Sequence, residues 1–127
     1  LIMKTLIQFL TAPLAPLTSI LVVINITNFT AVCVVLASDG YPVAYEKGFE
    51  ITGLEKFEGK EDYFCFHAGT KFNEAGKIVT NGGRVLGITA TGADLKEARK
   101  KAYEATEWVN FANKYMRHDI GKAIDEA

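Results

Sequence analysis

The 127-residue sequence lacks charge in its first third and lacks a strong net charge as a whole. Residues 1–38 contain one charged side chain, Lys4, whereas residues 39–127 contain the other 28 of 29. The formal net charge is −1 and the pI is about 6.1. This balance argues against a nucleic-acid-binding protein that works through a broad basic patch, and against a polyacidic tail. We therefore expect no nucleic-acid partner.

Cysteine and histidine are also scarce, with two residues of each. Cys33 and Cys65 lie far apart, each inside an apolar run, so they do not form a disulfide framework. Two buried, reduced thiols are typical of a cytoplasmic protein. His67 and His118 do not combine with the cysteines into a metal-ligand spacing. The sequence therefore predicts a cytoplasmic protein without a metal site.

No apolar run is long enough for a membrane-spanning helix, which needs about 20 residues. The longest, residues 14–24, is interrupted by Pro16, Thr18 and Ser19. Lys4 precedes an apolar stretch, which leaves a targeting segment open, but no small-x-small cleavage site closes that stretch. The preferred interpretation is that the nearly uncharged residues 1–38 form buried core or a surface that a partner covers. We expect no membrane partner.

What is present, 49% hydrophobic and 23% charged residues, suits one domain with a modest core. Residues 1–10 have helical spacing and are followed by Pro13 and Pro16, which predicts a short helix. Residues 31–37 form a continuous apolar run, which predicts a strand buried on both faces. Further strands are expected at residues 19–24, 49–52, 63–71, 77–80 and 84–91, with a hairpin loop at 72–77, a surface loop at 56–62 and a bulge at Gly87.

After these strands the spacing of apolar residues becomes that of an amphipathic helix. They recur at three- and four-residue intervals from Leu95 to Met116. Asp94 is the expected N-cap, with Glu97 in the capping-box position, and Gly121 is a candidate C-cap. Ion pairs Glu97–Lys101 and Lys100–Glu104 are expected on its solvent face. The fold class is α+β: a mainly antiparallel sheet packed against one long C-terminal amphipathic helix, with a short N-terminal linking helix.

Chemistry is concentrated where His67–Thr70 faces Thr80–Arg84 across the predicted hairpin. Glycines allow a ligand to approach the backbone, and the guanidinium of Arg84 suits phosphate or carboxylate. A tight glycine-rich turn with one surface arginine is the structural alternative, and it stays open. His67 is better explained as a core or edge histidine than as a general base. No nucleotide-binding glycine motif is present. The residues alone indicate an anion-contacting domain and not a self-sufficient enzyme.

Five segments, taken in order, closely resemble the C-terminal domain of the phosphoribosylamine–glycine ligase (glycinamide ribonucleotide synthetase) family of ATP-grasp ligases. These segments are AVCVVLASDGYP (31–42), YEKG (45–48), HAGT (67–70), KIVTNGGRVLG (77–87) and RHDIG (117–121). Residues 1–10 resemble the helix that links the catalytic core of the family to this domain. The expected organisation is therefore a linking helix and divergent connector or strand at 1–30, followed by the ligase C-terminal domain at 31–127.

The resemblance implies an enzyme that joins glycine to 5-phosphoribosylamine in de novo purine biosynthesis. ATP, with Mg or Mn, is then cleaved to ADP and phosphate through a glycyl phosphate. It implies that the N-terminal and ATP-grasp domains are the partners of this domain, that they hold the ATP and metal sites, and that this domain binds no cofactor alone. This C-terminal domain would close one side of the active-site cleft and would not be active alone.

The resemblance also implies the roles of the site residues, none of which is catalytic or metal-binding. Arg84, with backbone groups of Asn81, Gly82 and Gly83, would face the phosphate or carboxylate groups of substrate, and His67 and Thr70 would orient that turn. The sequence departs from the family in two places. In the predicted turn at residues 38–42, Asp39 stands where the family has a glycine, and residues 11–30 lack the expected acidic character. A stand-alone binding module with this fold and an exported or membrane-tethered domain are the alternative functions.

Overall fold

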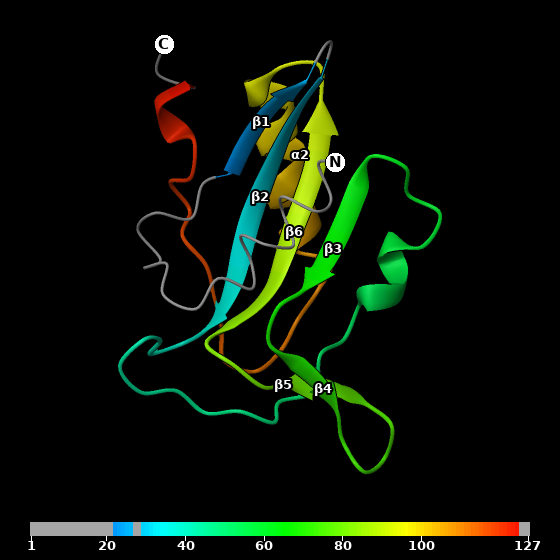
Figure 1. Ribbon diagram of the computed structural model, residues 1–127, viewed down its shortest axis with the longest axis vertical. Helices are drawn as coiled ribbons and strands as arrows, with labels where there is room; N and C mark the ends of the chain where they lie inside the picture. Colours follow the sequence, from blue (N-terminus) through cyan, green and yellow to red (C-terminus); the bar gives the residue numbers. More distant parts are fainter. Residues whose placement is uncertain (1–21, 27–28, 125–127) are drawn as a thin grey trace.

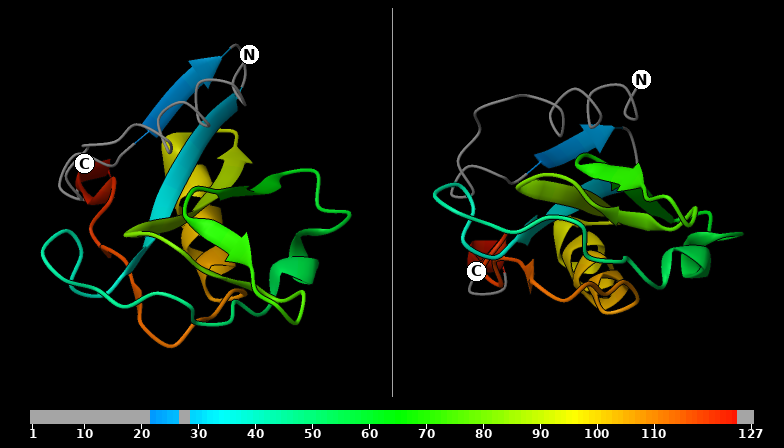
Figure 2. Two further views of the ribbon diagram at one scale, coloured as in Figure 1. Left: turned by 60° about the horizontal axis from the view of Figure 1, so that its bottom comes forward. Right: turned by 90° about the horizontal axis from the view of Figure 1, so that it is seen from below.

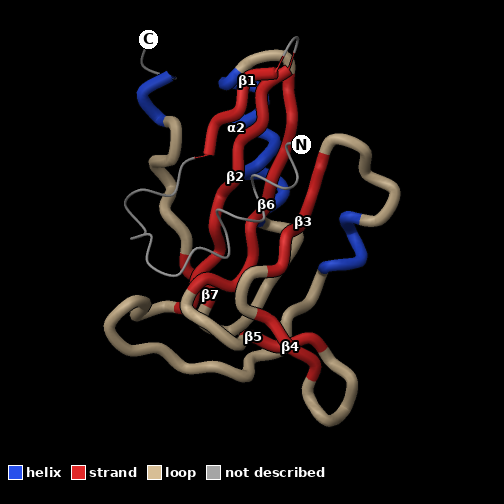
Figure 3. Tube along the Cα trace, viewed as in Figure 1, coloured by secondary structure: helices blue, strands red, loops and turns tan. Residues whose placement is uncertain are grey.

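The computed structural model describes residues 22–26 and 29–124, and its centre is an antiparallel five-stranded sheet (Figure 1). The strand order is β1-β2-β6-β3, and β7 pairs with the end of β2 (Figure 3). A second, two-stranded sheet consists of β4 and β5. The strands are β1 (Val22–Ile26), β2 (Phe29–Ser38), β3 (Tyr63–His67), β4 (Thr70–Phe72), β5 (Ile78–Thr80), β6 (Arg84–Gly92) and β7 (Lys114–Tyr115).

One helix, α2 (Leu95–Thr106), lies against one face of the five-stranded sheet (Figure 2). Two short 3-10 turns complete the described elements, η2 (Leu54–Phe57) and η3 (Lys122–Ile124). The core lies between α2 and the sheet, where small alanines let the helix approach closely. Its fully buried members include Val34, Leu36, Leu86, Ile88, Ala98, Ala102 and Ala105. The expected α+β class with a mainly antiparallel sheet is confirmed.

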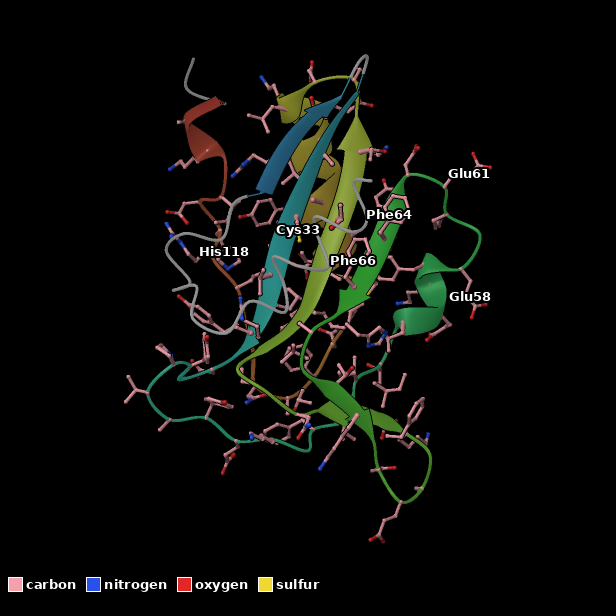
Figure 4. All side chains as sticks on the ribbon, viewed as in Figure 1. Cys33, Glu58, Glu61, Phe64, Phe66 and His118 are labelled. Carbon is pink, nitrogen blue, oxygen red and sulfur yellow. The ribbon has the colours of Figure 1, made fainter. Side chains whose placement is uncertain are left out.

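Strand β2 is buried on both faces, as its apolar run predicts. Val32, Val34 and Leu36 belong to the core cluster under α2, and Cys33 and Val35, which alternate with them, are also at most 4% exposed. Phe64 and Phe66 on β3 stack with ring centroids 6.1 Å apart (Figure 4). In the described ranges, no helix is long and apolar enough to cross a membrane.

The predicted long C-terminal helix is wrong in its length, because α2 ends at Thr106 and not at Met116. Apolar residues keep the helical spacing beyond Thr106 because Val109 and Met116 are also buried, although their backbone is not helical. Gly121 is therefore not the C-cap of this helix. The N-terminus of α2 has the predicted capping box. The Asp94 carboxylate accepts from the N–H of Glu97 at 2.8 Å, and the Glu97 carboxylate accepts from the N–H of Ala93 at 2.8 Å.

Neither predicted ion pair on the helix forms among the described residues. Glu97 is used in the capping box, and Lys101 turns to the sheet. Its ammonium donates to the Thr91 carbonyl at 2.8 Å and to the Asp62 carboxylate at 3.1 Å. Tertiary partners thus outcompete the helix neighbours, which contribute only about 0.3–0.5 kcal/mol in a solvated pair.

Several strand boundaries also differ from the prediction. The strand expected at 63–71 is divided into β3 and β4, and residues 49–52 make only isolated bridges. The bulge is not at Gly87, which pairs in register with Val35. Instead, Leu36 pairs with Leu86 and Ala37 with Arg84, so Val85 is the extra residue. The strand expected at 19–24 is β1, at 22–26. The predicted linking helix at 1–10 lies outside the described residues.

The RHDIG segment (117–121) is fastened to α2 by two side chains of that helix. The Tyr103 hydroxyl donates to the Arg117 carbonyl at 2.7 Å and accepts from the Ile120 N–H at 3.0 Å. The Arg99 guanidinium donates to the carbonyls of Ile120 and His118 at 2.6 and 3.2 Å. These four hydrogen bonds give the segment a structural role in closing the C-terminal end of the domain.

Candidate functional site

The two glycine-containing segments of the candidate site meet in the structure, as the sequence predicts. The N–H of Asn81 donates to the carbonyl of Gly69 at 2.8 Å. A Cβ atom on Gly69 would overlap the carbonyl oxygen of Arg84 and would lie 3.0 Å from the Cα of Gly82. The two backbones therefore approach as closely as they do because both residues are glycine.

A pocket of about 250 Å³ lies at this junction. Its described lining residues come from the turn after β2, the connection between β3 and β4, the turn between β5 and β6, and the first residue of β6. Four of the six predicted site residues line it, and among its described lining residues Arg84 is the only charged one. The lining residues are Tyr41, Ala68, Gly69, Asn81, Gly82, Gly83 and Arg84.

His67 and Thr70 do not line the pocket but contact each other beside it. Nδ1 of His67 lies 2.9 Å from the hydroxyl of Thr70, which bridges the connection between β3 and β4. Partial burial lowers the pKa of His67 below its usual value, so the neutral ring is favoured. The arrangement suits a residue that holds the connection between β3 and β4 beside the pocket.

Two backbone amide groups in the turn between β5 and β6 (residues 81–83) have no acceptor in the described part of the chain. The N–H groups of Gly82 and Gly83 donate to no described residue, and Gly83 is buried. The N–H of Asn81 is not available to a ligand in this way, because it donates to Gly69. Buried N–H groups are almost always paired, so an unpaired one beside an arginine is typical of an anion site.

Sequence reasoning missed two residues of the site, Ser38 and Tyr41. Ser38 is fully buried at the end of β2, and its hydroxyl donates to the Gly82 carbonyl at 2.8 Å. The ring of Tyr41 covers Gly83 and forms one wall of the pocket. Both residues belong to the turn 38–42, and no local pattern connects that turn to residues 82–83, more than forty positions away.

Metal chemistry has no ligand set in the described ranges, where no group of three or more His, Cys, Asp or Glu side chains is close enough to hold an ion. The described lining of the pocket consists of one cation, one phenol, one amide, one alanine and three glycines. Such a lining suits an anion. These described residues include neither a nucleophile next to a base nor a carboxylate pair for acid–base catalysis.

Comparison with known proteins assigns the domain. Residues 31–123 match the family model described as "Phosphoribosylglycinamide synthetase, C domain". The chain belongs to this family.

The curated relatives of this synthetase C domain are much longer than the chain. A phosphoribosylamine–glycine ligase of Synechocystis is 54% identical over 91 residues, which are 72% of this chain and 21% of that protein. A chloroplastic phosphoribosylamine–glycine ligase of Arabidopsis thaliana is 50% identical over 93 residues, 72% of this chain and 18% of that protein. The chain thus spans about a fifth of the length of these relatives.

A solved structure supports the same assignment. The crystal structure of phosphoribosylamine–glycine ligase from Thermotoga maritima aligns with a TM-score of 0.62 at 50% identity, over 71% of this chain and 21% of that one. Every described residue that lines the pocket lies inside the range that matches the family model. The described lining of the pocket is therefore part of the synthetase C domain.

Proposed function

We propose that this chain acts as the C-terminal domain of an ATP-dependent ligase that joins glycine to 5-phosphoribosylamine in de novo purine biosynthesis. In this proposal the domain closes one side of the active-site cleft and has no turnover alone. The family assignment and the names of the relatives support the reaction class. The lining of the pocket supports a binding role, since it offers an anion site without a nucleophile or general base.

The observation that carries the proposal is that the N–H groups of Gly82 and Gly83, next to Arg84, have no acceptor among the described residues. In the proposed role, these three residues bind a phosphate or carboxylate group of the substrate, while His67 and Thr70 hold the connection behind them. Arginine suits either anion because its planar guanidinium can donate two parallel hydrogen bonds. Donors that are fixed in advance at such a site bind the anion without the cost of ordering the turn.

The ATP and the Mg or Mn that the reaction requires belong, in this proposal, to the N-terminal and ATP-grasp domains of the same enzyme. The described residues fit no metal ion. The proposal places the protein in the cytoplasm, with glycine and phosphoribosylamine as its small-molecule partners and with neither a nucleic acid nor a membrane among its partners.

The reaction class is tested with a chimera in which residues 31–123 replace the matching segment of the Synechocystis ligase. We expect the chimera to form the glycinamide product, and we expect neither this chain alone nor the ligase without that segment to form it. A folded but inactive chimera contradicts the proposal. Activity of this chain alone also contradicts it, because the described residues would then contain a complete active site.

The role of Arg84 is tested by Arg84→Ala in the same chimera. Loss of a charge-assisted hydrogen bond of about 1.5–3 kcal/mol raises the KM of the substrate that carries the anion about 10- to 100-fold. A rise for phosphoribosylamine alone identifies the phosphate, and a rise for glycine alone identifies the carboxylate. Lys71→Ala is the matched control, because Lys71 is an exposed cation on neighbouring β4 that does not line the pocket. Unchanged KM values for both substrates in Arg84→Ala rule out the anion site.

A further inference from the structure

Ser38 makes two hydrogen bonds to consecutive peptide groups of the turn that carries Arg84. Its hydroxyl donates to the carbonyl of Gly82 at 2.8 Å, and its N–H donates to the carbonyl of Gly83 at 2.7 Å. Its own carbonyl accepts from the N–H of Tyr41 at 3.1 Å. Ser38 is fully buried, and every polar group that it carries is therefore used inside the protein.

The turn needs these hydrogen bonds from outside because its own backbone is conformationally flexible. Gly82 and Gly83 have no Cβ atoms to restrict their dihedral angles, so each populates more of φ/ψ space than any other residue. Among the described residues, no other donor reaches either of the two carbonyls. The conformation of the turn thus depends on Ser38.

Fixing these carbonyls also fixes the direction of the donors on the other side of the same peptide groups. The peptide bonds here are trans, so a carbonyl and the N–H of the next residue point in opposite directions. The Gly82 carbonyl points to Ser38, and the N–H of Gly83 therefore points away from it. In the same way, the bond to the Gly83 carbonyl orients the peptide group from which Arg84 begins.

We infer that Ser38 is a positioning residue for the anion pocket. It orients the N–H of Gly83 and the backbone of Arg84 for ligand binding, although it does not line the pocket itself. Through its carbonyl it also holds Tyr41, the wall that covers Gly83. This inference rests on the proposed function, because the ligand is the anionic group of the ligase substrate.

The test is Ser38→Ala in the active chimera, with kcat and KM measured for both substrates. We expect a rise in KM of about five- to tenfold for the same substrate that Arg84→Ala affects, in line with the loss of one neutral hydrogen bond. We expect kcat to change less than about twofold, since binding is weakened equally in the ground and transition states. In the double variant Ser38→Ala/Arg84→Ala we expect a KM rise smaller than the product of the two single effects, because part of the effect of Ser38 passes through Arg84.

Thr106→Val is the matched control for a merely structural effect. Thr106 is also fully buried, its hydroxyl donates to the carbonyl of Tyr103, and it is not among the residues that line the pocket. We expect this variant to lower the melting temperature and to leave both KM values unchanged. If Ser38→Ala does not fold, Ser38→Cys tests the same point, because its thiol is a weaker donor of similar size. The expected result is then a smaller rise in the same KM.

Three results would overturn the inference while leaving the proposed function intact. These are an unchanged KM in Ser38→Ala when Arg84→Ala raises it, an equal KM rise in Thr106→Val, and effects of Ser38→Ala and Arg84→Ala that multiply in the double variant. If Arg84→Ala itself changes neither KM, the proposed anion site fails, and the positioning role of Ser38 fails with it.

Discussion

The ring of Tyr41 occupies the space that the Cβ atom of any residue other than glycine at position 83 would need. A Cβ built on Gly83 overlaps Cδ2, Cε2 and Cγ of that ring. The obstacle is a side chain that forms the wall of the anion pocket and also meets Tyr45 edge-on, with the centroids 5.7 Å apart. Position 83 therefore requires glycine because of a neighbour and not because of a positive φ.

We expect Gly83→Ala to displace Tyr41 and to lower the free energy of unfolding by about 1–3 kcal/mol, the usual cost of overpacking. Urea denaturation of this chain measures the effect. Tyr41→Ala removes the obstacle, so Gly83→Ala should cost much less in that background. If the substitution costs as much with and without the ring, the contact between Tyr41 and Gly83 is not what requires glycine.

The attachment of residues 117–121 to α2 leads to a second prediction. Arg99→Met removes the two hydrogen bonds to the carbonyls of His118 and Ile120. We expect it to lower the free energy of unfolding by about 1.5–3 kcal/mol, since the donor is charged. Calorimetry measures the loss, and amide exchange should accelerate at Ile120, whose N–H donates to Tyr103. Lys100→Met, on the exposed side of the same helix, is the control and should change neither.

His67 should make the stability of the domain depend on pH. Burial lowers its pKa in the folded state, so between that value and the unfolded value of about 6.5 the unfolded chain binds the extra proton. Stability is therefore fully present above about pH 6.5 and declines as the pH falls through this window. We expect His67→Gln to reduce the decline between about pH 7.5 and about pH 5. An NMR titration that places the imidazole pKa at or above its ordinary value would contradict this.

The two thiols should be inert while the domain is folded. Burial raises the pKa of Cys33 to about 11 and that of Cys65 to about 12, so almost no thiolate exists near neutral pH. We expect neither to react with an aromatic disulfide reagent at about pH 8 until denaturant is added, and both to react then. Cys65→Ala assigns any residual signal to Cys33. Labelling of the folded chain within minutes would show that the thiols are accessible.

The sequence predicted the parts of the fold that depend on local chemistry. The apolar run of β2, the hairpin between β4 and β5 and the capping box at Asp94 and Glu97 all have short-range causes, and the structure contains them. The meeting of the HAGT segment with the glycine turn follows from the same hairpin. A pattern inside fewer than twenty residues was enough for each of these.

The length of α2 could not be predicted in this way, because distant residues end it. The ring of Trp108 packs against Phe57 and Tyr63, with centroids 5.2 and 4.8 Å away, and Asn110 bridges to Thr52. These contacts draw the chain away from the helix axis while Val109 stays buried. Helical periodicity therefore continues in the sequence after the helix has ended.

The roles of Ser38 and Tyr41 were missed for a related reason. Serine, glycine, tyrosine and proline together indicate a turn, and they do form one after β2. Their contacts with Gly82 and Gly83 arise only because β2 and β6 are neighbours in the sheet. A sequence identifies such a residue only when the pairing of its strand is already known.

The order of the strands also sets when the pocket can form during synthesis. Strand β2 pairs with β6, which begins 46 positions after β2 ends, and Ser38 pairs with Lys114 of β7. Contacts so distant along the chain are slow to form, because a long loop must close before they contribute. The strand that ends in Ser38 acquires its last neighbour only after residue 114 has left the ribosome. The glycine turn and its arginine are therefore assembled late, when nearly the whole domain is available to fold.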